Sequence, residues 1–280
     1  MTEPLLSATD VVVEYPGRGF RAAPHRVLHG VSLEVRPGET VGLVGESGSG
    51  KTTLGRAILG LADVHSGTIT FDGRDITSAT RSERRILSRD LQVVFQDPYS
   101  SLNPVMNVED ALVEPLAVHG IGTRADARRK AAEILDRVQL PASALRRLPR
   151  EFSGGQRQRI AIARTLMVDP QLIICDEPVS ALDVSTQDKV ITLLAEIQQQ
   201  FGIAYLFIAH DLPLVRQISN RVAVMRHGHI VEWGDSEVIG TRPQHPYTQQ
   251  LLLATPVPDP ERQRIRRAQR HAMLAEAESA

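Results

Sequence analysis

The sequence lacks several features that would indicate a secreted or membrane-spanning protein. It contains one cysteine, Cys175, which can form neither an internal disulfide nor a cysteine-ligated cluster, and this fits a reducing compartment. No apolar run approaches the ~18 residues that a membrane span needs. The N-terminus has neither the basic start nor the apolar stretch of a signal peptide. We therefore expect a cytoplasmic chain, which other chains would have to hold at any membrane where it works.

The sequence also lacks an excess of charge of either sign. Its 32 basic residues nearly balance its 33 acidic ones, so no net field attracts nucleic acid, and we expect no nucleic-acid partner. Lysine is scarce, and arginine supplies nearly all the positive charge. One of the few lysines, Lys51, follows the glycine- and serine-rich stretch "GESGSG". The apolar "ETVGLVG" before it indicates a buried strand, and "TLGRAILGL" after it has helical spacing.

The stretch from Gly45 to Thr53 predicts a phosphate-binding loop. It matches G-x-x-x-x-G-K-[ST], in which backbone N–H groups wrap phosphates at a helix N-terminus. Lys51 would then reach the β and γ phosphates of a nucleoside triphosphate, and the Thr52 hydroxyl would bind Mg²⁺. The alternative is a flexible glycine turn. The predicted nucleotide-binding residues of this loop are Gly45, Glu46, Ser47, Gly48, Ser49, Gly50, Lys51, Thr52 and Thr53, with the Glu46 side chain pointing to solvent.

Two carboxylates in "QLIICDEPVSALD" are candidate partners for the metal and the attacking water. The apolar residues Leu172 to Cys175 predict a short buried strand that ends in Asp176 and Glu177. Ligands of parallel sheets lie beyond the carboxyl ends of the strands. We therefore expect Asp176 near Mg²⁺ bound at Thr52, and Glu177 as the general base that polarises the attacking water. The alternative is a solvated acidic turn.

The stretch "FSGGQRQRIAIARTLM" carries a family resemblance. Ser153 and Gln156 have the spacing of a capping box before a helix, but capping does not explain Gly154 and Gly155. These glycines expose backbone N–H groups at the positive helix end, where a second phosphate could bind. Here the sequence resembles the nucleotide-binding subunits of ABC transporters, whose signature reads LSGGQ, with Phe152 in place of the leading leucine. The resemblance implies that the signature contacts ATP held by a partner subunit.

Four further residues take their roles only from this resemblance. Gln96 matches the glutamine that senses Mg²⁺ and the attacking water, and His210 matches the switch histidine that contacts the γ phosphate. Asp183, in "SALD", resembles the D-loop, which crosses to the partner subunit. Tyr15 matches the aromatic residue on which the family stacks adenine, and Phe20 lies close enough in sequence to compete for that role.

Two segments point to one subfamily. "VVFQDPYSSLNP" and "RPQHPYTQQLLLATPVPDP", which contains His245, Pro246 and Tyr247, resemble the ATPase subunits of oligopeptide, dipeptide and nickel importers. The combination with "GKTTLGR" is similar to the second of the two ATPases in that subfamily. This resemblance implies a second, usually different, ATPase subunit, two transmembrane permease subunits and an extracytoplasmic binding protein. It also implies a peripheral position on the cytoplasmic face of the inner membrane.

The resemblance implies an α/β fold with three parts: a RecA-like P-loop core, an antiparallel β subdomain and an inserted α-helical subdomain. We expect an ATPase domain over residues 1–235, with the helical subdomain at about 100–165. A C-terminal extension over 236–280 would end in a charged surface tail from about 261. No iron–sulfur cluster is expected, since some relatives carry a cysteine-rich C-terminal segment and this chain has only Cys175.

The function that these features predict is ATP hydrolysis, with ATP and Mg²⁺ as the ligands, coupled to import of oligopeptides or dipeptides. The cargo could also be nickel or another small solute, and an exporter fits the two subfamily segments less well. The competing classes are a non-transport ABC ATPase that acts on nucleic acid or ribosomes, and a P-loop kinase. The first would carry coiled coils or tandem cassettes, and the second would lack "SGGQ".

Overall fold

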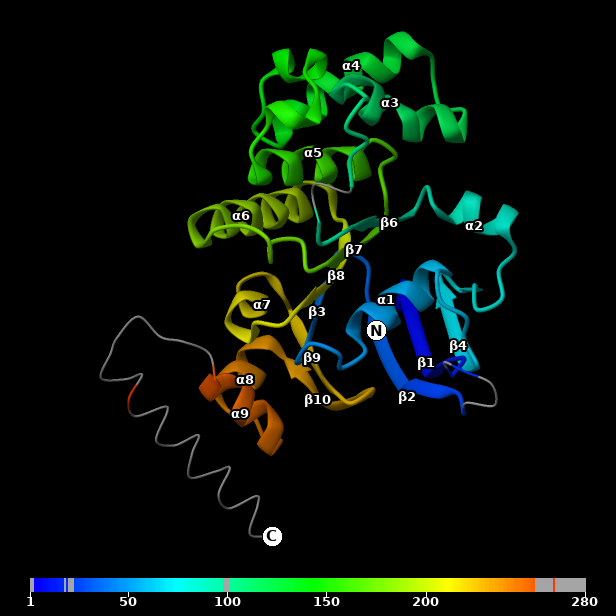
Figure 1. Cartoon of the computed structure of the whole chain (residues 1–280), viewed down its shortest axis with the longest axis vertical. Helices are drawn as coiled ribbons and strands as arrows, with labels where there is room; N and C mark the ends of the chain where they lie inside the picture. Colours follow the sequence, from blue (N-terminus) through cyan, green and yellow to red (C-terminus); the bar gives the residue numbers. More distant parts are fainter. Residues whose placement is uncertain (1–2, 18, 20–22, 98–100, 255–263, 265–280) are drawn as a thin grey trace.

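Two β-sheets of different kinds form the frame of the protein (Figure 1). The computed structural model describes residues 3–17, 19, 23–97, 101–254 and 264. The smaller sheet is antiparallel, with the strand order β2-β1-β4-β5. Its strands are β1 (Leu6–Tyr15), β2 (His25–Val35), β4 (Ser66–Phe71) and β5 (Arg74–Asp75). These strands alternate between buried and exposed residues, as a sheet with one face on the core requires.

The larger sheet has the strand order β10-β9-β3-β8-β7-β6 and is parallel from β9 to β6. β10 pairs with β9 in the antiparallel sense. The strands are β3 (Thr40–Val44), β6 (Leu91–Val94), β7 (Leu172–Asp176), β8 (Ala204–Ala209), β9 (Arg221–Arg226) and β10 (His229–Asp235). β3, β7 and β8 are apolar and almost wholly buried, because elements cover both faces of this sheet.

The helices between β6 and β7 in the chain form a group of their own, the helix at Arg81–Leu87 stands apart at the side of the molecule, and the other helices lie around the larger sheet (Figure 1). That group contains α3 (Val108–His119), α4 (Arg124–Arg137), α5 (Gly154–Leu166) and the 3-10 turns at Ala142–Arg146 and Pro149–Glu151. The remaining helices are α1 (Lys51–Leu59), α2 (Arg81–Leu87), α6 (Val184–Phe201), α7 (Leu212–Ile218), α8 (Ser236–Thr241) and α9 (Pro246–Ala254). Among the described residues, none of these helices combines the length and apolarity that crossing a membrane would take.

The larger sheet separates two hydrophobic cores, and alternate side chains of β7 belong to one core or the other. Leu172 and Ile174 pack with α1 and the antiparallel sheet, whereas Ile173 and Cys175 pack with the helices on the other face. Because successive strand residues point to opposite faces, Asp176 falls on the same face as Leu172 and Ile174. The last residue of β7 therefore directs its carboxylate toward α1.

The predicted helix in "RADARRKAAEILDRV" is α4. Thr123 caps its first turn in a reciprocal capping box with Asp126, and Ala127, Ala131 and Ile134 are buried on one face. The arrangement of a parallel core, an antiparallel sheet and inserted helices agrees with the predicted fold class.

Some sequence predictions concern residues beyond those that the structure describes. Phe20, residues 98–100 of "VVFQDPYSSLNP" and the predicted tail from 261, apart from Arg264, lie outside the described residues.

Close packing of β3 against α7 generates a stability prediction. A Cβ at Gly42 would lie 2.0 Å from Val215 Cγ1 and 2.7 Å from Ser219 Oγ. We expect Gly42→Ala to lower the free energy of unfolding by about 1–3 kcal/mol, the usual cost of overpacking a core. Urea unfolding with Gly234→Ala as control measures this, because a Cβ at Gly234 meets only ordinary contacts, the nearest at 3.5 Å. Equal stability of the two variants would contradict the prediction.

Candidate functional site

The loop between β3 and α1 needs glycine for two physical reasons. A Cβ at Gly45 would lie 2.1 Å from the Met225 carbonyl oxygen of β9, so only glycine fits there. Gly48 and Gly50 adopt φ of 80° and 108°, in the left-handed region that other residues rarely occupy. Gly50 is the residue before α1, and it supplies no side-chain cap. The first N–H groups of α1 therefore have no side-chain partner at Gly50 and lie at the positive end of the helix dipole.

Lys51 is held inside this loop. Its side chain is buried, at 3% exposure, and its ammonium donates to the carbonyl oxygens of Gly45 at 2.7 Å and Glu46 at 2.9 Å. Burial lowers the pKa of Lys51, and the nearby carboxylates of Glu177, Asp176 and Glu46 oppose that shift. The loop thus holds the Lys51 ammonium where it can contact an anion bound at the loop.

Thr52 and Asp176 meet across the gap between α1 and β7. The Thr52 hydroxyl donates to Asp176 Oδ1 at 3.0 Å. Burial raises the pKa of Asp176, although the hydrogen bond from Thr52 opposes that rise. Hydroxyl and carboxylate oxygens are ligands that Mg²⁺ prefers, and a desolvated carboxylate gains from a bound cation. This pair therefore fits a magnesium ion.

Glu177 has a strained backbone that redirects its side chain. Its φ is 48°, uncommon for a residue with a Cβ, and its N–H donates to the Ile208 carbonyl of β8 at 3.0 Å. Without that turn, strand alternation would direct Glu177 to the face opposite Asp176. Glu177 Oε2 lies 3.7 Å from Nδ1 of His210, which is 59% exposed.

Lys51, Thr52 and Glu177 line one polar hollow of about 290 Å³. Asp176 and His210 do not line it, but they contact its lining residues Thr52 and Glu177. Its lining residues are Val27, Ser47, Gly48, Gly50, Lys51, Thr52, Thr53, Gln96 and Glu177. The structure thus brings together the predicted loop, the predicted general base and the glutamine after β6. The hollow offers backbone donors and a cation on one side and the Glu177 carboxylate on the other, with Asp176 behind Thr52, which suits a polyphosphate that carries a metal.

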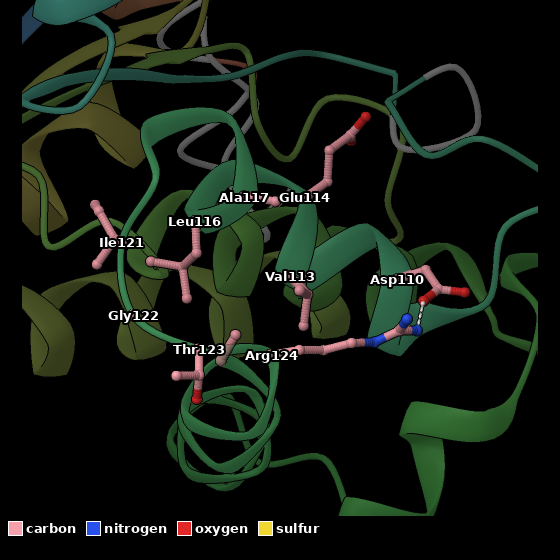
Figure 2. Close-up of a pocket in the computed structure, with 10 residues that line it drawn as sticks. Asp110, Val113, Glu114, Leu116, Ala117, Ile121, Gly122, Thr123 and Arg124 are labelled. Atoms are coloured by element: carbon pink, nitrogen blue, oxygen red, sulfur yellow. Dashed lines mark hydrogen bonds and ion pairs between the residues drawn. The ribbon is translucent and has the colours of Figure 1, made fainter.

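The hollow is not the largest in the described part of the chain. A hollow between α3 and α4 has a volume of about 340 Å³. Figure 2 shows its lining residues, among which Arg124 points to Asp110; their N–O distance is 3.4 Å. Val113, Leu116 and Ile121 supply much of its apolar wall. None of the predicted site residues lines it, and its arginine already has a carboxylate partner.

Not every predicted site residue lines this polar hollow. Tyr15 ends β1, is 38% exposed and does not line the hollow. Ser153 and Gln156 form the predicted capping box at the exposed start of α5, away from the hollow's lining. Asp183 caps α6, and hydrogen bonds from Thr186 and Ser185 lower its pKa to about 2. An adenine contact of Tyr15 and contacts between chains remain predictions.

Gly155 has a packing role that the sequence did not indicate. A Cβ at this position would lie 2.4 Å from Thr186 Cγ2, so the first turn of α5 can approach α6 only with glycine there. This close approach is an additional reason for glycine at this position, beside the exposed N–H groups predicted above.

Two contacts at the hollow escaped sequence reasoning. Val27 of β2 lines it, and nothing in the local sequence marks this valine. The Glu46 N–H donates to the Tyr247 hydroxyl at 3.0 Å, across 201 positions of the chain. The Glu46 side chain is exposed, as predicted. The His-Pro-Tyr element singled out Tyr247, but no spacing rule connects it to the loop.

Two family models match the chain. The family described as "ABC transporter" matches residues 28–180, and the family described as "Oligopeptide/dipeptide transporter, C-terminal region" matches residues 231–279. The chain is also 49% identical over 264 residues to the glutathione import ATP-binding protein GsiA of Pectobacterium atrosepticum, covering 93% of this chain and 42% of that protein. GsiA of Escherichia coli K12 is 49% identical over 269 residues, covering 95% of this chain and 43% of that protein. The chain therefore spans less than half the length of these curated relatives.

Solved structures resemble the fold over most of the chain. CbiO1 from Clostridium perfringens, part of the ABC transporter complex cbiONQ, superposes with a TM-score of 0.75 at 26% identity. The match covers 86% of this chain and 92% of that one. The ATP-binding cassette MJ0796, in a dimeric structure bound to ADP and Pi, has a TM-score of 0.73 at 27% identity, covering 82% of this chain and 98% of that one.

The position of Lys51 generates a binding prediction. We expect Lys51→Ala to weaken binding of MgATP by more than about 10²-fold, because several charge-assisted hydrogen bonds of about 1.5–3 kcal/mol each would be lost. Isothermal titration calorimetry measures the affinity. Lys189→Ala is the matched control, since it removes an exposed lysine from α6. Unchanged affinity in Lys51→Ala would show that the loop does not bind phosphates.

Proposed function

Because this chain belongs to the ABC transporter family, we propose that it binds and hydrolyses ATP to drive the import of peptides through a membrane transporter. The observation that carries the proposal is the convergence of Lys51, Thr52 and Glu177 around one polar hollow, with Asp176 bonded to Thr52. The C-terminal match to oligopeptide and dipeptide transporters supports the choice of peptides.

Lys51 and the start of α1 bind the triphosphate in this proposal. The ammonium leaves part of its contact with the Gly45 and Glu46 carbonyls and donates to the β and γ phosphates. The N–H groups from Gly48 to Thr53 surround the same phosphates at the positive end of α1. Tyr15 stacks on adenine.

Thr52 and Asp176 would hold Mg²⁺, with Gln96 at the same hollow. When bound, the ion supplies positive charge that offsets the charge of the phosphates. Glu177 takes a proton from a water molecule as the water oxygen bonds the γ phosphorus and the bond to the ADP oxygen breaks. His210, 3.7 Å from Glu177, orients that carboxylate and contacts the γ phosphate. The products are ADP and phosphate, and no phosphoryl group remains on the protein.

A second ATPase subunit completes each site. Ser153, Gly154, Gly155 and Gln156 close over ATP held by the neighbour, and Asp183 lies in the loop that crosses to it. The dimeric structures of MJ0796 support pairing of such cassettes. We propose that the pair binds two permease subunits at the cytoplasmic face of the membrane, and that an extracytoplasmic protein delivers the cargo. Residues 1–235 would form the ATPase domain and 236–280 the extension.

Peptides are the proposed cargo because two comparisons agree on them. The relatives named for glutathione import act on a tripeptide, and the C-terminal family is named for oligopeptides and dipeptides. Nickel and other small solutes are the second candidates, since the subfamily that the motifs resemble includes nickel importers.

The two carboxylates should differ when each is made neutral. We expect Glu177→Gln to retain MgATP binding and to lower turnover by about 10²- to 10⁴-fold, the usual contribution of a positioned general base. Asp176→Asn should also raise the Mg²⁺ concentration needed for half-maximal turnover, because it removes a metal ligand. Steady-state ATPase assays of the assembled transporter over a Mg²⁺ series measure both. Full turnover in both variants would contradict this mechanism.

Transport itself is tested with the chain purified together with its membrane subunits and binding protein in proteoliposomes. We expect ATP-dependent uptake of labelled glutathione or dialanine, and loss of uptake when Glu177→Gln replaces the chain. Uptake of ⁶³Ni²⁺ without peptide uptake would identify the second candidate. Uptake of none of these, with ATP hydrolysis intact, would overturn the proposed import of peptides.

A further inference from the structure

The C-terminal segment contacts the phosphate loop through one tyrosine. Tyr247, in the first turn of α9, is 3% exposed, and its hydroxyl oxygen accepts the hydrogen bond from the Glu46 N–H at 3.0 Å. Burial raises the pKa of Tyr247, so the phenol stays neutral near pH 7. Glu46 is the second residue of the loop that surrounds Lys51.

Side chains of β9 and β10 hold Tyr247 in this position. The Glu232 carboxylate accepts hydrogen bonds from the backbone N–H groups of Gln244 at 2.6 Å and His245 at 3.2 Å. His245 Nδ1 accepts from the Tyr247 N–H at 3.1 Å, and the Arg226 guanidinium lies 4.8 Å from the centre of the tyrosine ring. The His-Pro-Tyr element is therefore a fixed support for the phenol.

Tyr247 and Lys51 hold the two ends of the same peptide group. The Gly45 carbonyl and the Glu46 N–H belong to one planar unit. Lys51 donates to the carbonyl at 2.7 Å, and Tyr247 accepts from the N–H at 3.0 Å. Hydrogen bonds at both ends of a peptide group polarise it and strengthen one another. The orientation of this unit thus places the nearest of the three acceptors that hold the lysine ammonium, beside the Glu46 carbonyl and the Ser49 hydroxyl.

We propose that Tyr247 is a positioning residue for the nucleotide site, which fixes the Gly45–Glu46 peptide and so prepares Lys51 to meet the phosphates. This inference rests on the proposed binding of ATP at the loop. A loop that is already ordered loses less conformational freedom when it binds a ligand, and affinity rises accordingly. Because coupling between two sites is reciprocal, bound ATP must also stabilise the docking of α9.

Tyr247→Phe tests the hydroxyl alone, because the ring and its contact with Arg226 remain. The matched control is Tyr205→Phe, since the Tyr205 hydroxyl is buried and has no hydrogen-bond partner among the described residues. We expect Tyr247→Phe to weaken MgATP binding by about 2- to 10-fold, the effect of one hydrogen bond. Tyr205→Phe should bind as the unsubstituted chain does. Calorimetric titration gives the affinities, and thermal unfolding without ATP shows whether the fold is intact.

Amide hydrogen exchange tests whether bound ATP stabilises the docking of α9. In the unsubstituted chain, MgATP should slow exchange of the amides in residues 247–254, and in Tyr247→Phe this protection should be largely lost. A purely structural role for Tyr247 would lower the unfolding midpoint without changing the response of α9 to ATP. If Tyr247→Phe is unstable, the exchange measurement on the unsubstituted chain still decides, because no ATP-dependent protection of α9 would overturn the inference.

The outcomes separate this inference from the proposed function. Equal MgATP affinity in Tyr247→Phe and the unsubstituted chain would overturn the role of Tyr247 and leave ATP binding intact. Failure of the unsubstituted chain to bind MgATP would instead overturn the proposed function.

Discussion

A buried lysine ammonium is the constraint on which the rest of the site depends. Lys51 is 3% exposed, and a cation in that position is costly unless the surrounding groups compensate for the water it has lost. Two loop carbonyls do so directly, and three carboxylates do so at longer range. The tight loop that presents those carbonyls requires glycine at Gly45, where the β9 backbone leaves no space for a side chain. The loop and the acidic end of β7 therefore form one electrostatic unit, and the end of β9 limits the space of the loop.

The parts of the fold and site that could be predicted from sequence are those with local signals. The α/β fold class is confirmed by the solved structures that superpose on the chain, and the family resemblance is confirmed by the match over residues 28–180. The apolar run before Asp176 predicted a buried strand. Because ligands lie beyond the carboxyl ends of parallel strands, Asp176 was also predicted to lie near Thr52, and its Oδ1 is 3.0 Å from the Thr52 hydroxyl oxygen. Their binding of a metal stays a prediction.

The parts that could not be predicted depend on contacts between distant segments. Alternation alone would direct Glu177 away from Asp176, and only the left-handed turn, anchored to Ile208 of the neighbouring strand, brings it to the hollow. Tyr247 meets Glu46 across 201 positions, and no periodicity encodes such a contact.

The contact between Gly155 and Thr186 has a consequence for how this sequence can diverge. The start of α5 lies so close to α6 that a Cβ at position 155 would be 2.4 Å from the Thr186 methyl group. An alanine at 155 is tolerable only with a smaller side chain at 186, such as serine, while a serine at 186 alone leaves a small void. Homologous chains should therefore change these two positions together or in a fixed order, with position 186 first.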